Sequence, residues 1–269
     1  MKTIKDLQNL KETGNKMPVL FIGHGSPMNG IENNQFTAGW KKSVENVPKP
    51  KAVIVVSAHW ETLGTKITAM PKPRTIHDFG GFPLALFEVK YDAWGNPELA
   101  KEIAENLKQK FIELDETWGL DHGTWTVLKH LYPNADIPVL QLSLNRLQTP
   151  QQHYELAKEL AFLREKSVLI IGSGNMVHNL RQINFTNNGG YNWADSANNT
   201  FKDLILSGAH DKLIKYESLG RDVALSVPTA EHYLPLLYVL GLKKEDENIE
   251  IFNDSVDLGS ISMTSVKIG

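Results

Sequence analysis

One segment constrains the fold more than any other: Lys51-Ala-Val-Ile-Val-Val-Ser-Ala-His-Trp60. Its apolar residues follow one another without a break, which is typical of a strand covered on both faces, as in a parallel sheet flanked by helices. Ligands bind at the carboxyl edge of such a sheet. His59, which comes just after the strand predicted over 52–57, is therefore expected at that edge, within reach of a metal ion or a substrate.

A second apolar run, 18–22, leads in the same way into a glycine-containing turn that holds His24. Taken alone, this histidine is equally compatible with an ordinary turn. A helical pattern over 33–46 separates the two strands, however, and right-handed crossovers of this kind make the strands parallel. His24 and His59 are thus predicted to leave the same edge of the sheet.

A third apolar run, 167–171, leads into Gly172-Ser-Gly-Asn-Met-Val-His178. The two glycines resemble the start of a dinucleotide-binding GxGxxG motif, but Val177 stands where the third glycine belongs, which argues against that site. His178 is instead a further candidate for the sheet edge.

The predicted fold class is α/β, a single domain with a central, largely parallel sheet flanked by helices. Further strands are expected at 137–143 and within 249–268, and helices over 96–111 and 151–164. A chain of 269 residues with 41% hydrophobic and 22% charged residues suits one large domain. Residues 1–16 are predicted to be a polar lead-in, and residues 17–269 to be the folded domain.

Composition excludes some kinds of metal site and makes some classes of partner unlikely. The chain has no cysteine, so thiolate metal sites and disulfides are excluded, and a reducing cytoplasmic location is expected. The formal charge of −3 predicts no nucleic-acid partner. No apolar run approaches the roughly 20 residues that span a bilayer, so no membrane association is expected. Oligomeric state stays open.

Two further histidines are predicted at helix starts. Asp121 is expected to cap a helix over 124–132, which places His122 near its N-terminus, where the helix dipole disfavours an imidazolium. A neutral imidazole is what a general base requires, although a surface histidine near a cap is the simpler alternative. Glu231 and His232 are expected in the first turn of another helix, where adjacent side chains point about 100° apart.

The remaining histidines have simpler interpretations. His77 lies in the long loop 71–96 and is assigned to packing within it, and His130 is assigned to the interior of a helix. His153 and His210 are predicted to be solvated. A site rich in imidazole, with a carboxylate and no sulfur, suits Fe(II) or Zn(II), and composition does not choose between the two metals.

Together, these motifs resemble the bacterial branch of the DOPA-type extradiol dioxygenases, within the protocatechuate 4,5-dioxygenase catalytic-subunit superfamily. The resemblance runs from about residue 17 to the C-terminus with the motifs in consistent order. They are Gly23-His-Gly-Ser-Pro27, Ser57-Ala-His-Trp60, Thr75-Ile-His-Asp-Phe-Gly-Gly-Phe-Pro83, Asp121-His-Gly-Thr-Trp125, Gly174-Asn-Met-Val-His-Asn179 and Pro228-Thr-Ala-Glu-His-Tyr-Leu-Pro235.

The resemblance implies that residues 17–269 form a catalytic domain that opens the ring of a catechol, such as L-DOPA, with O2 to give a semialdehyde. It implies one divalent metal, with Fe(II) for catalysis and Zn(II) as a metal that such proteins often hold.

The resemblance also assigns roles to residues. It implies His24 and His59 as metal ligands, His178 as an acid/base or a further ligand, and His122 as a second catalytic histidine. The third ligand is either Glu231 or His232, and the relatives that the sequence most resembles favour His232.

Two other functions fit the same residues. A zinc hydrolase would use the histidines to lower the pKa of a bound water, and would not need O2. A non-catalytic metal-binding protein would fill every coordination position with protein atoms.

Overall fold

The computed structural model describes residues 16–107 and 112–269. Residues 1–15, which make up all but the last residue of the predicted lead-in, lie outside the described residues, as does part of the helix predicted over 96–111.

The described residues form an eight-stranded sheet in the order β4-β3-β5-β2-β6-β1-β10-β7. The central strands β5, β2, β6 and β1 pair in parallel, whereas β10 and β7 add an antiparallel edge. The strands are β1 (Val19–Gly23), β2 (Ala52–Thr62), β3 (Thr65–Thr68), β4 (Ile112–Asp115), β5 (Val139–Asn145), β6 (Val168–Gly174), β7 (Ile249–Phe252) and β10 (Ser265–Ile268). This largely parallel sheet confirms the predicted α/β fold class.

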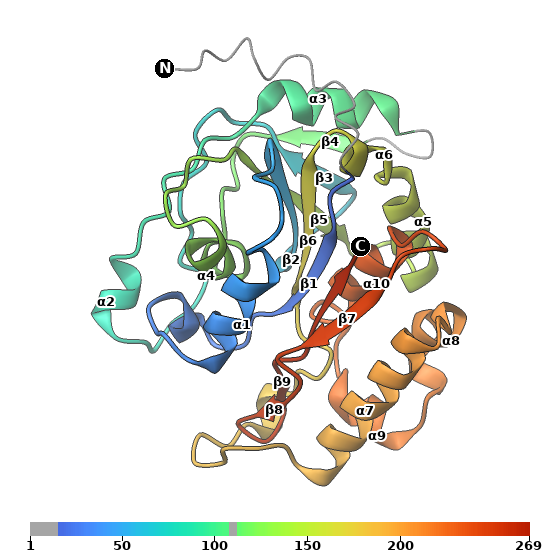
Figure 1. Ribbon diagram of the computed structural model, residues 1–269. Coiled ribbons are helices and arrows are strands. Elements are labelled where there is room, and N and C mark those ends of the chain that lie inside the picture. The colour runs from blue at the N-terminus through green and yellow to red at the C-terminus, as the bar shows by residue number, and fades with distance from the viewer. Residues whose placement is uncertain (1–15, 108–111) are drawn as a thin grey trace.

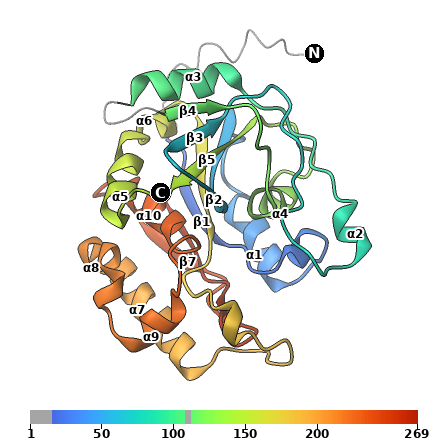
Figure 2. The ribbon, with the colours of Figure 1, turned by 180° about the vertical axis from the view of Figure 1, so that it is seen from behind.

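Helices cover both faces of the sheet (Figures 1 and 2). One face carries α1 (Gln35–Ser43), α2 (Leu84–Phe87) and α4 (His122–Leu131). The other carries α3 (Pro97–Asn106), α5 (Pro150–Glu159), α6 (Phe162–Glu165), α7 (Asn192–Leu206), α8 (His210–Ile214), α9 (Arg221–Ser226) and α10 (Leu234–Gly241). Short elements link them: η2 (Pro27–Gly30), η3 (Leu180–Gln182), η4 (Tyr216–Ser218), β8 (Val256–Asp257) and β9 (Ile261–Ser262).

The apolar runs make this layered arrangement possible because alternate residues of a strand point to opposite faces. In β2, Val53 and Val55 pack towards α1 and α4, whereas Ile54 and Val56 pack towards α5 and α10. Each of these side chains is fully buried. Burial of one such side chain contributes about 1.5–3 kcal/mol to the stability of the fold. The central strands therefore hold the residues at their carboxyl ends in fixed positions.

Two predicted boundaries near site residues are wrong, and the helix predicted over 151–164 is divided into α5 and α6. Strand β2 does not end at residue 57 but continues to Thr62, with irregular pairing between Val56 and Glu61. His59 therefore lies inside the irregular part of the strand rather than beyond it. Helix α10 begins only at Leu234, because Pro235 lacks the N–H that an interior helical position needs but suits the first turn.

A buried ion pair joins the start of the described chain to the segment that precedes β7. The Arg164 guanidinium is 1% exposed, donates to the backbone oxygen of Met17 and pairs with Glu247. Lys16 Nζ lies 2.7 Å from Glu247 Oε1. Burial disfavours the Glu247 carboxylate, but these cations outweigh it and hold the pKa of Glu247 at about 2.

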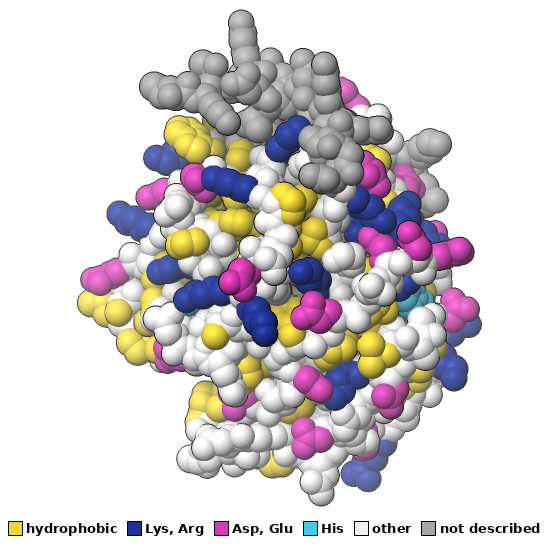
Figure 3. All heavy atoms as spheres, viewed as in Figure 1, with side chains coloured by type: hydrophobic (Ala, Val, Ile, Leu, Met, Phe, Trp, Pro, Cys, Tyr) yellow, Lys and Arg dark blue, Asp and Glu magenta, His cyan; other side chains and the backbone are white. Residues whose placement is uncertain are grey.

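The surface drawn in Figure 3 shows basic and acidic side chains interspersed, with little histidine visible. In the part of the chain that the structure describes, no helix combines the length and the apolar character needed to cross a bilayer.

Candidate metal centre

Five histidines from different elements converge in the structure. His24 directly follows β1, His59 lies in β2, and His178 follows β6. These three strands are neighbours and parallel, so they deliver their histidines to one edge of the sheet. His122 is the first residue of α4, and His232 lies in the turn before α10.

His24 and His59 are closest through their Nε2 atoms, which lie 3.1 Å apart. Their ring centroids are 5.1 Å apart. The His232 ring lies 5.4 Å from that of His24 and 5.0 Å from that of His59. The His122 ring lies 3.8 Å from that of His59. The predicted site residues thus occupy one compact cluster.

A serine fixes the orientation of His24. Ser173 Oγ donates to the Gly123 carbonyl oxygen at 2.5 Å and lies 3.0 Å from His24 Nδ1. Because its only proton is already committed, the hydroxyl must accept from His24 Nδ1–H. The neutral His24 ring therefore presents the lone pair of Nε2 to the centre of the cluster.

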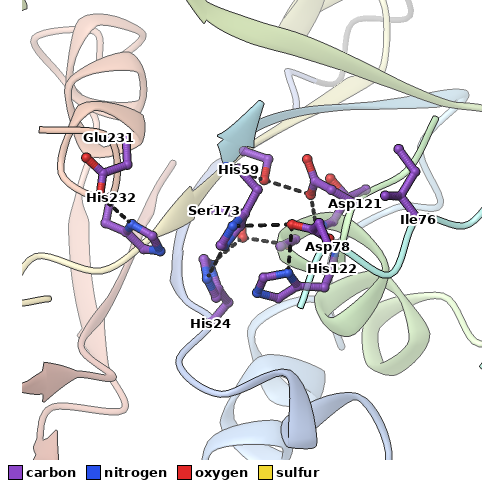
Figure 4. Close-up of polar contacts among 12 residues, drawn as sticks. His24, His59, Ile76, Asp78, Asp121, His122, Ser173, Glu231 and His232 are labelled. Carbon is purple, nitrogen blue, oxygen red and sulfur yellow. Dashed lines mark hydrogen bonds and ion pairs between the residues drawn. The ribbon is translucent and has the colours of Figure 1, made fainter. Parts of the chain in front are cut away.

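Asp78 orients two further rings, those of His59 and His122 (Figure 4). Its Oδ2 lies 2.9 Å from His122 Nδ1 and 3.4 Å from His59 Nδ1, and its Oδ1 accepts from the His122 backbone N–H at 2.9 Å. Burial opposes ionisation, but the bonds from His122 keep the pKa of Asp78 below its usual value. As an ionised acceptor, Asp78 places the ring proton of each histidine on Nδ1.

Glu231 makes the corresponding contact to His232. Its Oε1 lies 3.2 Å from His232 Nδ1 and accepts from the Thr229 hydroxyl at 2.9 Å. The carboxylate thus approaches His232 from the side opposite Nε2, and Figure 4 shows it lying away from His24. The His178 ring stacks on that of His232, with centroids 3.5 Å apart and planes 8° apart.

Burial keeps these imidazoles neutral. It lowers the pKa of His59 to about 3 and that of His178 to about 4, and the neighbouring histidines add to the effect. For His24 and His232, which are also buried, the pKa lies well below its usual value for the same reasons. At pH 7 these four rings are therefore neutral, and each has a nitrogen lone pair.

A divalent cation fits this arrangement. Two Nε2 lone pairs that face each other at 3.1 Å repel unless a cation lies beside both. Two nitrogens bound to one tetrahedral metal ion at 2.0–2.1 Å lie about 3.3 Å apart, close to the observed separation. Candidate ligand atoms of His24, His59 and His122 lie within 4.8 Å of one another, as do those of His178, Glu231 and His232.

Close packing holds the His59 ring in place. A Cβ atom on Gly123 would lie 2.5 Å from Ser57 Oγ and 2.9 Å from His59 Cδ2, so only glycine fits beneath His59. Asp121 caps α4 as predicted, with its side chain accepting from the Thr124 backbone N–H.

An aromatic loop borders the cluster. Phe79, one residue after Asp78, places its ring edge-to-face with His122, with the centroids 5.5 Å apart. His77, next to Asp78 on the other side, bonds through Nε2 to the Val89 carbonyl oxygen, which agrees with its predicted packing role. The loop therefore presents one aromatic wall and one carboxylate to the histidines.

Residues 18–268 match a family described as the catalytic LigB subunit of aromatic ring-opening dioxygenase. The chain belongs to this family. It is 47% identical over 259 residues to the 4,5-DOPA dioxygenase extradiol of Escherichia coli K12, with 94% of this chain and 95% of that protein covered. It is 36% identical over 266 residues to the protein of the same name from Beta vulgaris, with 96% and 97% covered.

A solved structure shares the fold. The crystal structure of an uncharacterized protein from Escherichia coli K12 superimposes with a TM-score of 0.80 at 40% identity, covering 94% of this chain and all of that one. The ring-opening dioxygenase family and these relatives confirm the predicted class, a metal-dependent extradiol dioxygenase. They favour that class over the zinc hydrolase and the non-catalytic metal-binding protein.

Sequence reasoning did not single out the residues that orient the histidines, namely Asp78 and Ser173. Asp78 stands inside a motif quoted for the resemblance, but 44 residues separate it from His122 in the chain. The prediction that His153 is solvated is wrong: it is fully buried and bonds through Nδ1 to the Tyr238 hydroxyl. His210, also predicted to be solvated, is half-buried and bonds to the Tyr154 hydroxyl.

Proposed function

We propose that the chain opens the ring of L-DOPA or a closely related catechol with O2, at a metal held by His24, His59 and His232. The observation that carries this proposal is the convergence of the rings: the Nε2 atoms of His24 and His59 lie 3.1 Å apart, and the His232 ring lies 5.4 and 5.0 Å from theirs. Each of the three has its Nδ1 in contact with a protein oxygen, from Ser173, Asp78 and Glu231 respectively. Such partners fix a ligand's tautomer and raise its basicity.

The position of Glu231 supports His232 as the third ligand. Glu231 Oε1 contacts the Nδ1 of its neighbour and accepts from Thr229, and the carboxylate lies on the side of the His232 ring away from His24 (Figure 4). We therefore assign Glu231 to orienting His232 rather than to binding the metal.

We further infer that Fe(II) is the metal for catalysis and that Zn(II) occupies the same ligands without supporting turnover. Imidazole ligands accept both metals. Bound Fe(II) supplies electrons that can be shared between a catecholate and O2, whereas Zn(II) has no accessible redox change.

The remaining two histidines have proton-transfer roles in this proposal. His122 Nε2 carries a lone pair because Asp78 holds the ring proton on Nδ1, so His122 can accept a proton from a catechol hydroxyl. The Asp78 carboxylate then faces the resulting imidazolium. His178, which stacks on His232, is neutral, accepts the proton of the second catechol hydroxyl and returns that proton later in the reaction.

The aromatic loop supports a flat substrate. Phe79 forms a cluster with Phe82 and Phe87, whose centroids lie 5.4 and 5.0 Å from its own. A catechol that donates to His122 would lie against this apolar wall, where stacked or edge-to-face contacts are favourable.

The direct test compares metals under matched conditions. Metal-free protein is loaded anaerobically with Fe(II) or Zn(II), and O2 uptake is followed with L-DOPA, simpler catechols and a control phenol that has one hydroxyl. We expect O2 uptake and a yellow product with the Fe(II) form alone, and only with catechols. Equal turnover of both metal forms, or turnover without O2, would contradict the proposal.

We also infer that the protein works in the cytoplasm without a nucleic-acid partner. The absence of cysteine and the near-neutral charge of −3 support this inference. Fluorescence of a tagged protein in fractionated cells measures the location directly.

A further inference from the structure

Asp78 stands out because a single oxygen of its carboxylate lies 2.9 Å from His122 Nδ1 and 3.4 Å from His59 Nδ1. It comes from the loop 71–96, not from the sheet edge that supplies the strand-end histidines. Its side chain is 17% exposed, and its contacts place it between His59 and His122. No proton-transfer step in the proposed reaction uses Asp78 directly.

We propose that Asp78 is the positioning residue that selects the tautomer of His122. The proposal rests on the proposed function, since it explains how His122 can serve as the base for a catechol. Asp78 accepts from both the backbone N–H and the ring Nδ1–H of His122, at 2.9 Å each. This two-point contact fixes both the ring plane and the position of its proton.

The chemical consequence follows from the number of ring protons. A neutral imidazole carries one N–H, so a proton held on Nδ1 leaves Nε2 as an acceptor. Without the carboxylate, His122 can also adopt the tautomer with the proton on Nε2, which cannot accept from a catechol hydroxyl. When the catechol O–H bond breaks, its proton moves to His122 Nε2, the electron pair stays on the catechol oxygen, and Asp78 faces the positive ring.

Asparagine in place of Asp78 should move the preferred position of the His122 ring proton from Nδ1 to Nε2. Its carbonyl oxygen can still accept from the His122 backbone N–H, but its NH2 group then faces Nδ1. A donor that faces Nδ1 requires Nδ1 to accept, which moves the ring proton to Nε2. The alternative amide orientation places the NH2 group against the backbone N–H, which brings two donors together.

Two variants separate a tautomer effect from a simple loss of packing. Asp78→Asn keeps the shape of the side chain but favours the His122 tautomer with the proton on Nε2. Asp78→Ala removes the partner, so His122 can adopt either tautomer. In Ser-His-Asp triads the same change of Asp to Asn lowers kcat by about 10⁴. We therefore expect Asp78→Asn to lower kcat by about 10²–10⁴, and to be at least as damaging as Asp78→Ala. A merely structural role predicts the opposite ranking.

The kinetic assays use the Fe(II) protein at saturating metal, because Asp78 also approaches Nδ1 of the proposed ligand His59 at 3.4 Å. Loss of such a contact typically lowers metal affinity by about 10–100-fold. Asp92→Asn is the matched control, since Asp92 is an exposed carboxylate of the same loop. It should leave kcat and metal affinity unchanged.

The deciding readout is ¹⁵N NMR of histidine in the diamagnetic Zn(II) protein, which requires neither O2 nor turnover. We expect the His122 proton on Nδ1 in the natural protein and on Nε2 in Asp78→Asn, with the signals assigned from a His122→Gln sample. Persistence of the Nδ1–H form in Asp78→Asn would overturn the proposal, as would a smaller loss of kcat than in Asp78→Ala. Failure of every catechol to react would instead count against the proposed function and leave the tautomer result intact.

Discussion

Ser173→Ala should weaken metal binding without disturbing the fold as a whole. The change removes one hydroxyl that contacts His24 Nδ1 at 3.0 Å and the Gly123 carbonyl oxygen at 2.5 Å. Without that acceptor, the His24 proton can move to Nε2, where it blocks the proposed ligand atom. Loss of a partner that orients a metal ligand costs about 10–100-fold in affinity, which corresponds to about 1.4–2.8 kcal/mol.

The same substitution should also lower the free energy of unfolding. Ser173 and His24 are both buried, so the His24 Nδ1–H is left without its acceptor. An unsatisfied buried group costs about 1–3 kcal/mol. Because this cost is small compared with the 5–15 kcal/mol of a typical domain, the variant should remain folded.

Zinc affinity is measured by competition with a chromophoric chelator, and stability by urea unfolding of the metal-free protein. Ser262→Ala is the matched control, because Ser262 is also fully buried, donates to Asn198 and accepts from the Thr264 backbone N–H. We expect both variants to lose similar stability and only Ser173→Ala to lose zinc affinity. Equal zinc affinity in the two variants would refute the role assigned to the serine.

Three further predictions concern other parts of the chain. Gly123→Ala introduces a Cβ at 2.9 Å from His59 Cδ2, so it should lower zinc affinity and cost about 1–3 kcal/mol of stability, measured by the same two titrations. His232→Ala should lower zinc affinity far more than Glu231→Gln does, and the reverse ranking would identify Glu231 as the ligand. The folded-state pKa of Glu247, about 2, lies below its ordinary value of 4.5, so its ion pairs stabilise the protein above pH 4.5 and are lost as the pH falls towards 2. Thermal melts should therefore show less acid destabilisation over that interval in Glu247→Gln than in the natural protein. At pH 7 the substitution should lower the free energy of unfolding by about 3 kcal/mol, because it leaves the buried Arg164 guanidinium without its counter-charge.

The sheet and the strand-end histidines could be predicted because their signals are local. An unbroken apolar run specifies a buried parallel strand, and one crossover between two such runs places His24 and His59 at the same edge. The cap at Asp121 is equally local, which is why His122 was expected near the start of α4.

The orienting residues could not be predicted because they depend on how the chain returns to the site. Asp78 reaches His122 from a long loop whose path no periodic pattern encodes. Ser173 lies in the middle of an apolar strand, where it looks like an ordinary buried residue until His24 is placed beside it. The error at His232 had a visible cause, since Pro235 already required a helix that begins later.

The most direct test of the central claim is the stoichiometry of a single turnover. Protein loaded with one equivalent of Fe(II) is mixed anaerobically with one equivalent of L-DOPA and then exposed to a measured amount of O2. The ligand set and the two proton-transfer histidines proposed here predict that one O2 is consumed and one ring-opened semialdehyde, heavier than L-DOPA by the mass of O2, is formed per iron. Recovery of intact L-DOPA with no O2 consumed, or conversion that proceeds before O2 is admitted, would contradict the claim.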